Sequence, residues 1–198
     1  GMQGDTSYYY PEATEGLLEA EDLPPVMAID PSAGGSAEFA YCVVKVWGGN
    51  YYVVEVGGKR NGSDDNWWRK LAVSCRRHHV NQVLVETNFG GLDVWAQVFK
   101  PHLRALKYGC AFEPFRSNQQ KQLRIIDTLA PLMQSHRLVV ARRVIEEDYK
   151  LVEASTDEKD LSYSLFHQMS RITYDRGCLY HDDRLDALAM ACQWFQEQ

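Results

Sequence analysis

The run Val26-Met27-Ala28-Ile29-Asp30 is a short apolar segment that ends in a carboxylate. Strand patterns follow it at residues 39–47 and 51–57. Turn residues separate the three segments, with Ala33-Gly34-Gly35 before the second and Gly48-Gly49-Asn50 before the third. Short turns of this kind join neighbouring antiparallel strands, so the sequence predicts an antiparallel meander that begins at Val26.

Helix and strand patterns alternate after the meander. The helical patterns cover residues 67–79, 92–108, 119–135, 144–170 (around an acidic loop at 155–160) and 182–196, and the strand patterns cover residues 83–86, 111–115 and 138–140. We expect Pro131 to kink or restart the third of these helices, because proline cannot donate a backbone hydrogen bond. The order predicts an α/β fold with a mixed sheet, three antiparallel strands and then parallel strands, flanked by helices.

The composition is that of an ordinary globular protein, with 45% hydrophobic and 24% charged residues in a chain of 198. Residues 1–25 are acidic and polar and contain several Pro and Gly residues, so we expect an N-terminal arm or linker there. Residues 26–198 are expected to form one domain. The first residues lack the basic and apolar regions of a secretion signal, and no apolar run reaches the roughly 18 residues of a membrane span. We therefore expect neither secretion nor membrane association.

The cysteines and the charge narrow the function classes. Five cysteines without a CxxC spacing predict free thiols in a reducing compartment and argue against a zinc site. The net charge of −6 argues against nucleic-acid binding by the whole surface. However, residues 1–38 hold eight acids and no Lys or Arg, whereas residues 100–143 hold nine Lys or Arg and two acids. A local basic track for phosphates is therefore compatible with the acidic whole.

Acidic residues stand at the ends of three core elements. Asp30 ends the first strand pattern, Glu86 ends a later apolar run, and Asp182, Asp183 and Asp186 open the last helix. A carboxylate at the mouth of a buried strand loses its hydration unless a cation lies beside it. Three such positions far apart in the sequence predict one shared cation site.

Each of these acids also has a purely structural explanation. Asp30 could cap a β-turn, and Glu86 could accept backbone N–H groups, although Glu is rarely buried without a partner. Acids at a helix start complement the helix dipole, and Asp182 could do only that. Asp183 and Asp186, three residues apart, lie on one helix face, where a divalent cation would relieve their repulsion. Both interpretations stay open for each residue taken alone.

The ligand types indicate which cation would bind. Oxygen ligands without a Cys or His cluster favour Mg²⁺ or Mn²⁺ over zinc. Two such ions about 4 Å apart activate water and stabilise the leaving 3′-oxygen in phosphodiester hydrolysis. Five basic residues could hold DNA phosphates or offset developing charge, or could be ordinary surface cations: Lys121, Arg124, Arg137, Arg142 and Arg143.

Five motifs, in order along the chain, resemble those of a known family. They are Ala28-Ile29-Asp30-Pro31-Ser32, Val85-Glu86-Thr87-Asn88-Phe89-Gly90, Arg124-Ile125-Ile126-Asp127-Thr128-Leu129, Ser135-His136-Arg137-Leu138-Val139-Val140 and His181-Asp182-Asp183-Arg184-Leu185-Asp186-Ala187-Leu188-Ala189. They resemble the nuclease domain of phage terminase large subunits, in particular of short-tailed, podophage-type viruses, within the ribonuclease H-like superfamily. The resemblance covers nearly the whole chain from Val26 onward. It implies a metal-dependent endonuclease that cuts concatemeric double-stranded viral DNA by two-metal hydrolysis.

The resemblance also implies partners and a location. Full-length members of the family carry an N-terminal packaging ATPase, but this chain has no P-loop motif. Because Gly1-Met2 also looks like the remnant of a tag, we expect an excised C-terminal domain. The implied partners are double-stranded DNA, the ATPase domain of the same protein, the portal and the small terminase subunit. The implied location is the cytoplasm of the host cell.

The roles of the acids follow from the motifs of the family. The resemblance implies that Asp30 and Glu86 bind the metals and that Asp183 completes a catalytic triad. Asp186, one turn along, would be an accessory ligand, and Asp182 could also bind. Among the acids of this helix, we expect Asp183 first and Asp186 second.

Three other functions stay open. A junction resolvase or transposase-type nuclease of the same superfamily would prefer branched DNA. An actin-like phosphotransferase would use the loop after Asp30 to cradle phosphates, although no second loop of this kind follows Glu86. A non-catalytic packaging adaptor would bind no metal, and its acids would be expendable.

Overall fold

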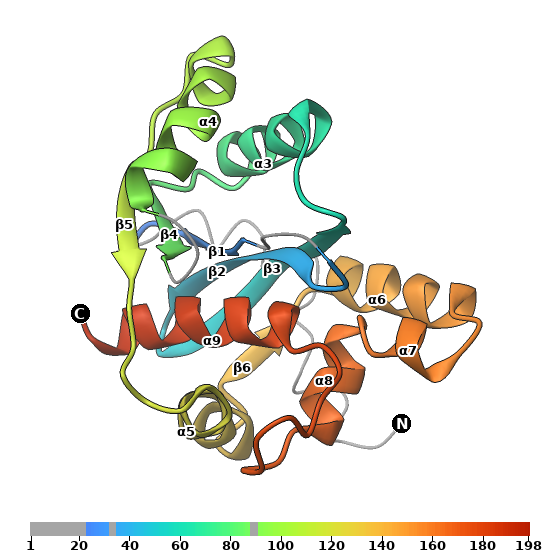
Figure 1. Ribbon diagram of the computed structural model, residues 1–198. Helices are drawn as coiled ribbons and strands as arrows, with labels where there is room; N and C mark the ends of the chain where they lie inside the picture. The colour runs from blue at the N-terminus through green and yellow to red at the C-terminus, as the bar shows by residue number, and fades with distance from the viewer. Residues whose placement is uncertain (1–22, 32–34, 88–90) are drawn as a thin grey trace.

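One mixed sheet lies at the centre of the computed structural model, which describes residues 23–31, 35–87 and 91–198 (Figure 1). Its strands are β1 (Val26–Asp30), β2 (Glu38–Trp47), β3 (Asn50–Arg60), β4 (Gln82–Glu86), β5 (Ala111–Phe115) and β6 (Leu138–Val140). They lie in the order β5-β4-β1-β2-β3-β6. The first three strands pair antiparallel, whereas β4 runs parallel to β1, β5 to β4 and β6 to β3. The predicted meander and mixed sheet are both confirmed.

Seven helices flank this sheet in the described residues. They are α3 (Asp65–Arg77), α4 (Leu92–Ala105), α5 (Lys121–Gln134), α6 (Arg142–Ala154), α7 (Glu158–Leu161), α8 (Leu165–Arg171) and α9 (Asp183–Gln196). The acidic loop expected at 155–160 contains the single turn of α7. Asp157 and Ser164 each accept a backbone N–H three residues later, and in this way they begin α7 and α8.

Pro131 does not restart α5, which continues through it as one helix to Gln134. The predicted restart is therefore wrong. Pro131 falls in the last turn, where the missing N–H removes only one backbone hydrogen bond. Leu129 and Leu132 on either side of it are buried and anchor this turn in the core.

The helices form a layer on each face of the sheet (Figure 1). Successive strand residues point to opposite faces, so Val26 and Ala28 pack with α5 and α9, whereas Met27 and Ile29 pack with α3 and α4. The buried surface of α9 extends around most of the helix and includes Ala187, Met190 and Ala191, because α9 lies between the sheet and the helices α5 and α8.

The strand register brings two acids to one edge of the sheet. Ile29 of β1 lies beside Val85 of β4 in parallel pairing, so the next residues, Asp30 and Glu86, end their strands side by side. The alternation along each strand points both side chains to the face that α9 covers. A local pattern of strand residues thus becomes a shared site at the carboxyl ends of β1 and β4.

Part of the predicted organisation lies outside the described residues. These include most of the arm expected over residues 1–25 and two residues of the turn at Ala33-Gly34-Gly35. The domain boundary at residue 26 therefore stays a prediction. Among the described residues, no helix combines the length and apolarity that a membrane crossing requires.

Candidate metal centre

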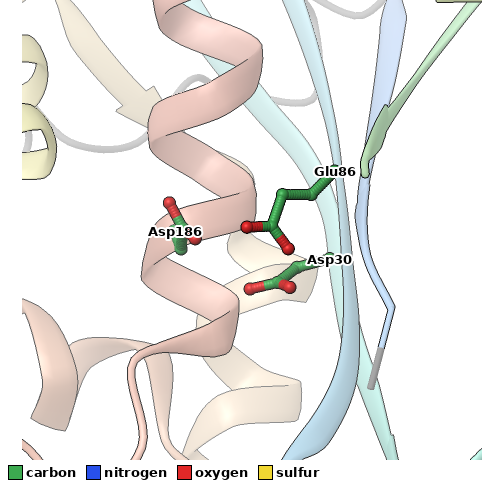
Figure 2. Close-up of side chains that lie close together, drawn as sticks. All are labelled: Asp30, Glu86 and Asp186. Carbon is green, nitrogen blue, oxygen red and sulfur yellow. The ribbon is translucent and has the colours of Figure 1, made fainter. Parts of the chain in front are cut away.

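Three carboxylates meet at this edge of the sheet. Asp30 from β1, Glu86 from β4 and Asp186 from α9 each offer an oxygen, and these oxygens lie within 4.8 Å of one another. Figure 2 shows the Asp186 side chain reaching from the helix toward the two acids of the sheet. Asp30 is 5% exposed and Asp186 is fully buried, whereas Glu86 is partly open to solvent. Oxygen ligands at this spacing suit a hard divalent cation.

The start of α9 determines where Asp186 lies. Asp182 precedes the helix, and its carbonyl accepts the N–H of Asp186 at 2.8 Å, which closes the first turn. Leu185 and Ala187 on either side are buried in the core. The helix can therefore turn little about its axis, and Asp186 is held toward the strand ends.

The acids have strongly perturbed ionisation. Burial raises the pKa of Asp30 well above its usual range, and the neighbouring charges of Asp186, Glu86 and Asp183 raise it further, whereas Lys121 lowers it. Burial also raises the pKa of Glu86, although a hydrogen bond with the Asp30 side chain lowers it in part. This carboxyl pair therefore binds protons more tightly than isolated carboxyl groups do, and a divalent cation would compete with those protons.

Two basic side chains of α5 partly neutralise the acids. The Lys121 Nζ lies 2.8 Å from Asp182 Oδ1, 3.1 Å from Asp186 Oδ2 and 3.7 Å from Asp30 Oδ2. Arg124 donates through Nη2 to Asp186 Oδ1. Burial works to lower the pKa of Lys121, but the carboxylates around it outweigh burial and raise that pKa. The ammonium group thus lies among the acids, where a cation is favoured.

Two oxygens of the centre, Asp30 Oδ2 and Asp186 Oδ2, lack a hydrogen bond among the described residues. Both are buried, although the charge of Lys121 is near. A buried carboxylate oxygen without a donor is unfavourable. Metal coordination would satisfy both, so the residues present fit a divalent ion.

Asp183 has a different partner from Asp186. Asp183 Oδ2 accepts the backbone N–H of Glu38 at 3.2 Å, and burial raises the pKa of Asp183 to about 6. The motifs favoured Asp183 as the direct ligand, and which acid of α9 binds metal stays a prediction. The geometry nevertheless groups Asp186, and not Asp183, with Asp30 and Glu86. The reason is the rotation of α9, which the spacing of the two acids does not reveal. Asp183 still lies near enough to raise the pKa of Asp30.

The predicted basic residues separate into two groups. Lys121 and Arg124 reach the acids, and Arg124 is only 4% exposed. Arg137 instead donates to the carbonyl of Gly49, in the turn at the opposite end of β2 and β3. Arg143 pairs with Glu147 at 2.8 Å, and Arg142 is exposed at the start of α6. Phosphate binding by Arg137, Arg142 and Arg143 stays a prediction away from the centre.

The sequence analysis missed a buried ion pair that supports the site. Arg184 donates to both carboxylate oxygens of Glu38, at 2.9 and 2.7 Å. This ion pair holds the start of β2 in place, where the backbone N–H of Glu38 donates to Asp183. Gly58 on β3 makes room, since a Cβ atom there would overlap the Glu38 carboxylate. The signal in the sequence was an acid at the start of a mostly apolar strand, followed by a neighbouring strand that contains a Gly-Gly pair.

The sheet order and the acids at its edge define a ribonuclease H-like domain. Residues 29–138 match the protein family described as "Terminase Bacteriophage T7, Ribonuclease H-like domain". The large terminase subunit of Enterobacteria phage T3 is 34% identical over 197 residues, which make up 99% of this chain and 33% of that protein. The chain therefore belongs to the family of T7-type phage terminase large subunits, as their ribonuclease H-like nuclease domain. It spans about a third of the length of the phage T3 relative.

Solved structures share the fold. The human cytomegalovirus terminase nuclease domain, Mn-soaked and inhibitor-bound, has a TM-score of 0.64 at 12% identity, covering 98% of this chain and 93% of that one. A K428A mutant nuclease domain of the large terminase subunit gp2 of bacterial virus Sf6, with manganese and beta-thujaplicinol, has a TM-score of 0.58 at 12% identity, covering 96% and 95%. At such low identities the likeness shows the common architecture alone.

Proposed function

We propose that this domain is a metal-dependent endonuclease that cuts double-stranded DNA by two-metal hydrolysis of phosphodiester bonds, with Mg²⁺ or Mn²⁺. The observation that carries the proposal is the group of three carboxylates within 4.8 Å of one another, of which Asp30 and Asp186 each have a buried oxygen without a hydrogen bond in the described residues. The related cytomegalovirus domain was soaked with manganese and the related Sf6 domain contains manganese, which supports the choice of metal.

Each acid has a part in this proposal. Asp30, Glu86 and Asp186 would hold the ions, with Asp183 as a further ligand and Asp182 at the rim. When bound, the ions activate water and stabilise the leaving 3′-oxygen. Glu86 is partly open to solvent, so this side of the centre is where the DNA backbone can approach.

Lys121 has a second role in the proposal. Its ammonium group supplies positive charge to the acids in the metal-free protein. It would release Asp30 and Asp186 when divalent ions take over that charge. Its long side chain, a third exposed, could then turn toward the phosphate backbone of the substrate.

The remaining properties come from the family. We propose that the natural substrate is concatemeric viral DNA in the host cytoplasm. The partners would be the packaging ATPase region of the same protein, the portal and the small terminase subunit. These belong to the whole protein, of which the chain is a part.

Cleavage of plasmid DNA tests the central proposal. We expect Mn²⁺- or Mg²⁺-dependent nicking and linearisation by the wild type. Asp30→Asn and Glu86→Gln should each reduce the rate by about a hundredfold or more, since a bound ion supplies several kcal/mol of transition-state stabilisation. Asp127→Asn, which removes a partly exposed acid of α5, is the matched control.

The outcomes separate the alternatives. Cleavage retained in both acid variants would remove the assignment, and absence of metal binding would indicate a non-catalytic adaptor. A strong preference for four-way junctions over linear duplex would instead indicate a resolvase-type nuclease. Membership of the terminase family leaves the actin-like phosphotransferase without support.

A further inference from the structure

A small pocket lies directly beside the metal centre. It has a volume of about 70 Å³ and is lined by Glu86, Phe115, Ser117, Gln119, Lys121 and Arg124. One ordered water needs only about 10–15 Å³, so the pocket has room for several waters or one tetrahedral oxyanion. Ser117 and Gln119 are exposed, which opens the pocket to solvent. Because Glu86 belongs to both, the pocket and the centre are continuous.

The N-terminus of α5 contributes to the wall of this pocket. The helix has 14 residues, and the side chain of its cap residue Gln120 makes no capping hydrogen bond to a backbone N–H of the first turn. The first backbone N–H groups of a helix have no partner within it, and the helix dipole is positive at this end. Both properties favour an anion at the end of β5.

Arg124 is a second and independent feature of the pocket. It is 4% exposed, and although Nη2 binds Asp186, its Nε and Nη1 donate to no residue in the described part of the chain. The guanidinium lies 5.1 Å from the centre of the Phe115 ring, which provides no hydrogen-bond acceptor oxygen. Buried donors without acceptors are unfavourable. The pocket thus presents unused hydrogen-bonding capacity together with a positive charge.

If the proposed function is correct, metal binding would increase the affinity of the pocket for an anion. Lys121 and Arg124 now share the negative charge of Asp30 and Asp186. Divalent ions held by these acids would take over that charge, so Arg124 would lose its counter-charge and Lys121 would keep only that of Asp182. A phosphate in the pocket would restore the balance.

We propose that this pocket binds one backbone phosphate of the DNA, next along the strand from the phosphate that is cut. The first-turn amides of α5, Arg124 and the Ser117 hydroxyl would contact it. Ser117 Oγ accepts the N–H of Gln119 at 3.2 Å and donates to no acceptor in the part of the chain that the structure describes, so its own proton is available to donate. The site would set the register of the strand across the metal centre, because one contacted phosphate fixes where the next one lies.

Ser117→Asp tests the pocket by placing a carboxylate at its mouth. We expect KM for DNA to rise about tenfold through charge repulsion, with kcat and Mn²⁺ affinity little changed, and the salt dependence of binding to fall by about one phosphate contact. An acid before a helix N-terminus does not disfavour the helix, so loss of folding is not the expected effect. Asn81→Asp, which adds the same charge at the exposed residue before β4, at the far end of that strand from Glu86, is the matched control and should keep the wild-type KM.

A cleavage map with single methylphosphonate linkages identifies the ligand. In the wild type we expect two minima in the cutting rate. One lies at the neutral linkage itself, and the other lies at a fixed number of nucleotides from it. In Ser117→Asp the second minimum should disappear. A wild-type KM in Ser117→Asp, or the same two minima in both proteins, would overturn the proposal.

Sulfate provides a readout that does not depend on cleavage. Magnesium sulfate, compared with magnesium chloride at equal ionic strength, should raise the thermal midpoint of the wild type by more than that of Ser117→Asp, because sulfate also stabilises folded proteins in general. Sulfate stabilisation without a second minimum in the map would mean a site for free anions and would reject the DNA phosphate. A wild type that binds sulfate but cuts no DNA with any metal would reject the proposed function and leave the pocket standing.

Discussion

Single charges at the sheet edge depend on one another. Asp30 and Asp186 are buried, Lys121 lies beside both of them, and Arg124 also binds Asp186. Removing one partner of such a group leaves uncompensated charge in a poorly solvated place. The consequences of single substitutions should therefore depend on whether metal is bound.

Lys121→Met should destabilise the metal-free protein by about 2 kcal/mol, less than for a fully buried pair because the lysine side chain is a third exposed. Saturating Mg²⁺ should restore most of the loss, since the ion replaces the missing charge. Urea unfolding with and without Mg²⁺ measures both quantities. Lys150→Met on the exposed face of α6 is the control and should have no effect in either condition. A loss that Mg²⁺ does not restore would contradict the role of Lys121.

The pH dependence of stability follows from the raised pKa values of Asp30, Glu86 and Asp183, the last to about 6. A carboxyl whose pKa is higher in the folded state binds protons more tightly there than in the unfolded chain. Its stabilising contribution is complete below about pH 4 and is lost as the pH rises through the folded value. Metal-free protein should therefore lose stability as the pH rises through 6, while Mn²⁺ affinity increases. Thermal midpoints and calorimetric titration across this range test both trends, and Asp30→Asn should flatten them.

At the scale of elements, the rotation of α9 selects the acid that joins the centre. Two acids three residues apart share a face, so their spacing does not distinguish them. Burial of Leu185 and Leu188 against the sheet points Asp186 toward Asp30, while Asp183 is left at the start of the helix beside Glu38. The packing of α9 therefore determines which of its acids lies beside the strand ends.

Asp186→Asn should weaken Mn²⁺ binding more than Asp183→Asn, by about tenfold or more, because only Asp186 lies within ligand distance of both other acids. Calorimetric titration of both variants gives the comparison. Thermal midpoints without metal separate lost affinity from lost folding, since Asp186 also binds Arg124. A greater loss in Asp183→Asn would return Asp183 to the first position.

At the scale of the whole molecule, the centre joins parts that are distant in the chain. β1, β4 and α9 each contribute one acid, and they come from the beginning, the middle and the end of the domain. The unfolded chain does not hold these oxygens together. Bound metal should therefore stabilise the fold as a whole and not one element alone.

Mg²⁺ or Mn²⁺ should raise the thermal midpoint of the wild type, with about 2.7 kcal/mol of stabilisation at a free concentration one hundred times Kd. EDTA should reverse the shift. The double variant Asp30→Asn with Asp186→Asn should show no shift, while Asp127→Asn should behave as wild type. Differential scanning calorimetry over a series of metal concentrations measures the effect. An equal shift in the double variant would mean that the metal binds elsewhere.

Local patterns in the sequence determined the strands, most helix positions and the acids at their ends. Alternation, turn residues and apolar runs depend on neighbours only a few residues apart, and β1, β5 and β6 begin and end where the patterns predict. The motifs also determined the family. The contacts around the acids, in contrast, join residues that are far apart in the sequence. The tertiary structure alone decided that Asp186 meets Asp30 and that Glu38 pairs with Arg184. It also placed Arg124 inside the protein and Arg137 at the far end of the sheet. These outcomes depend on helix rotation and strand register, which packing of the whole chain sets.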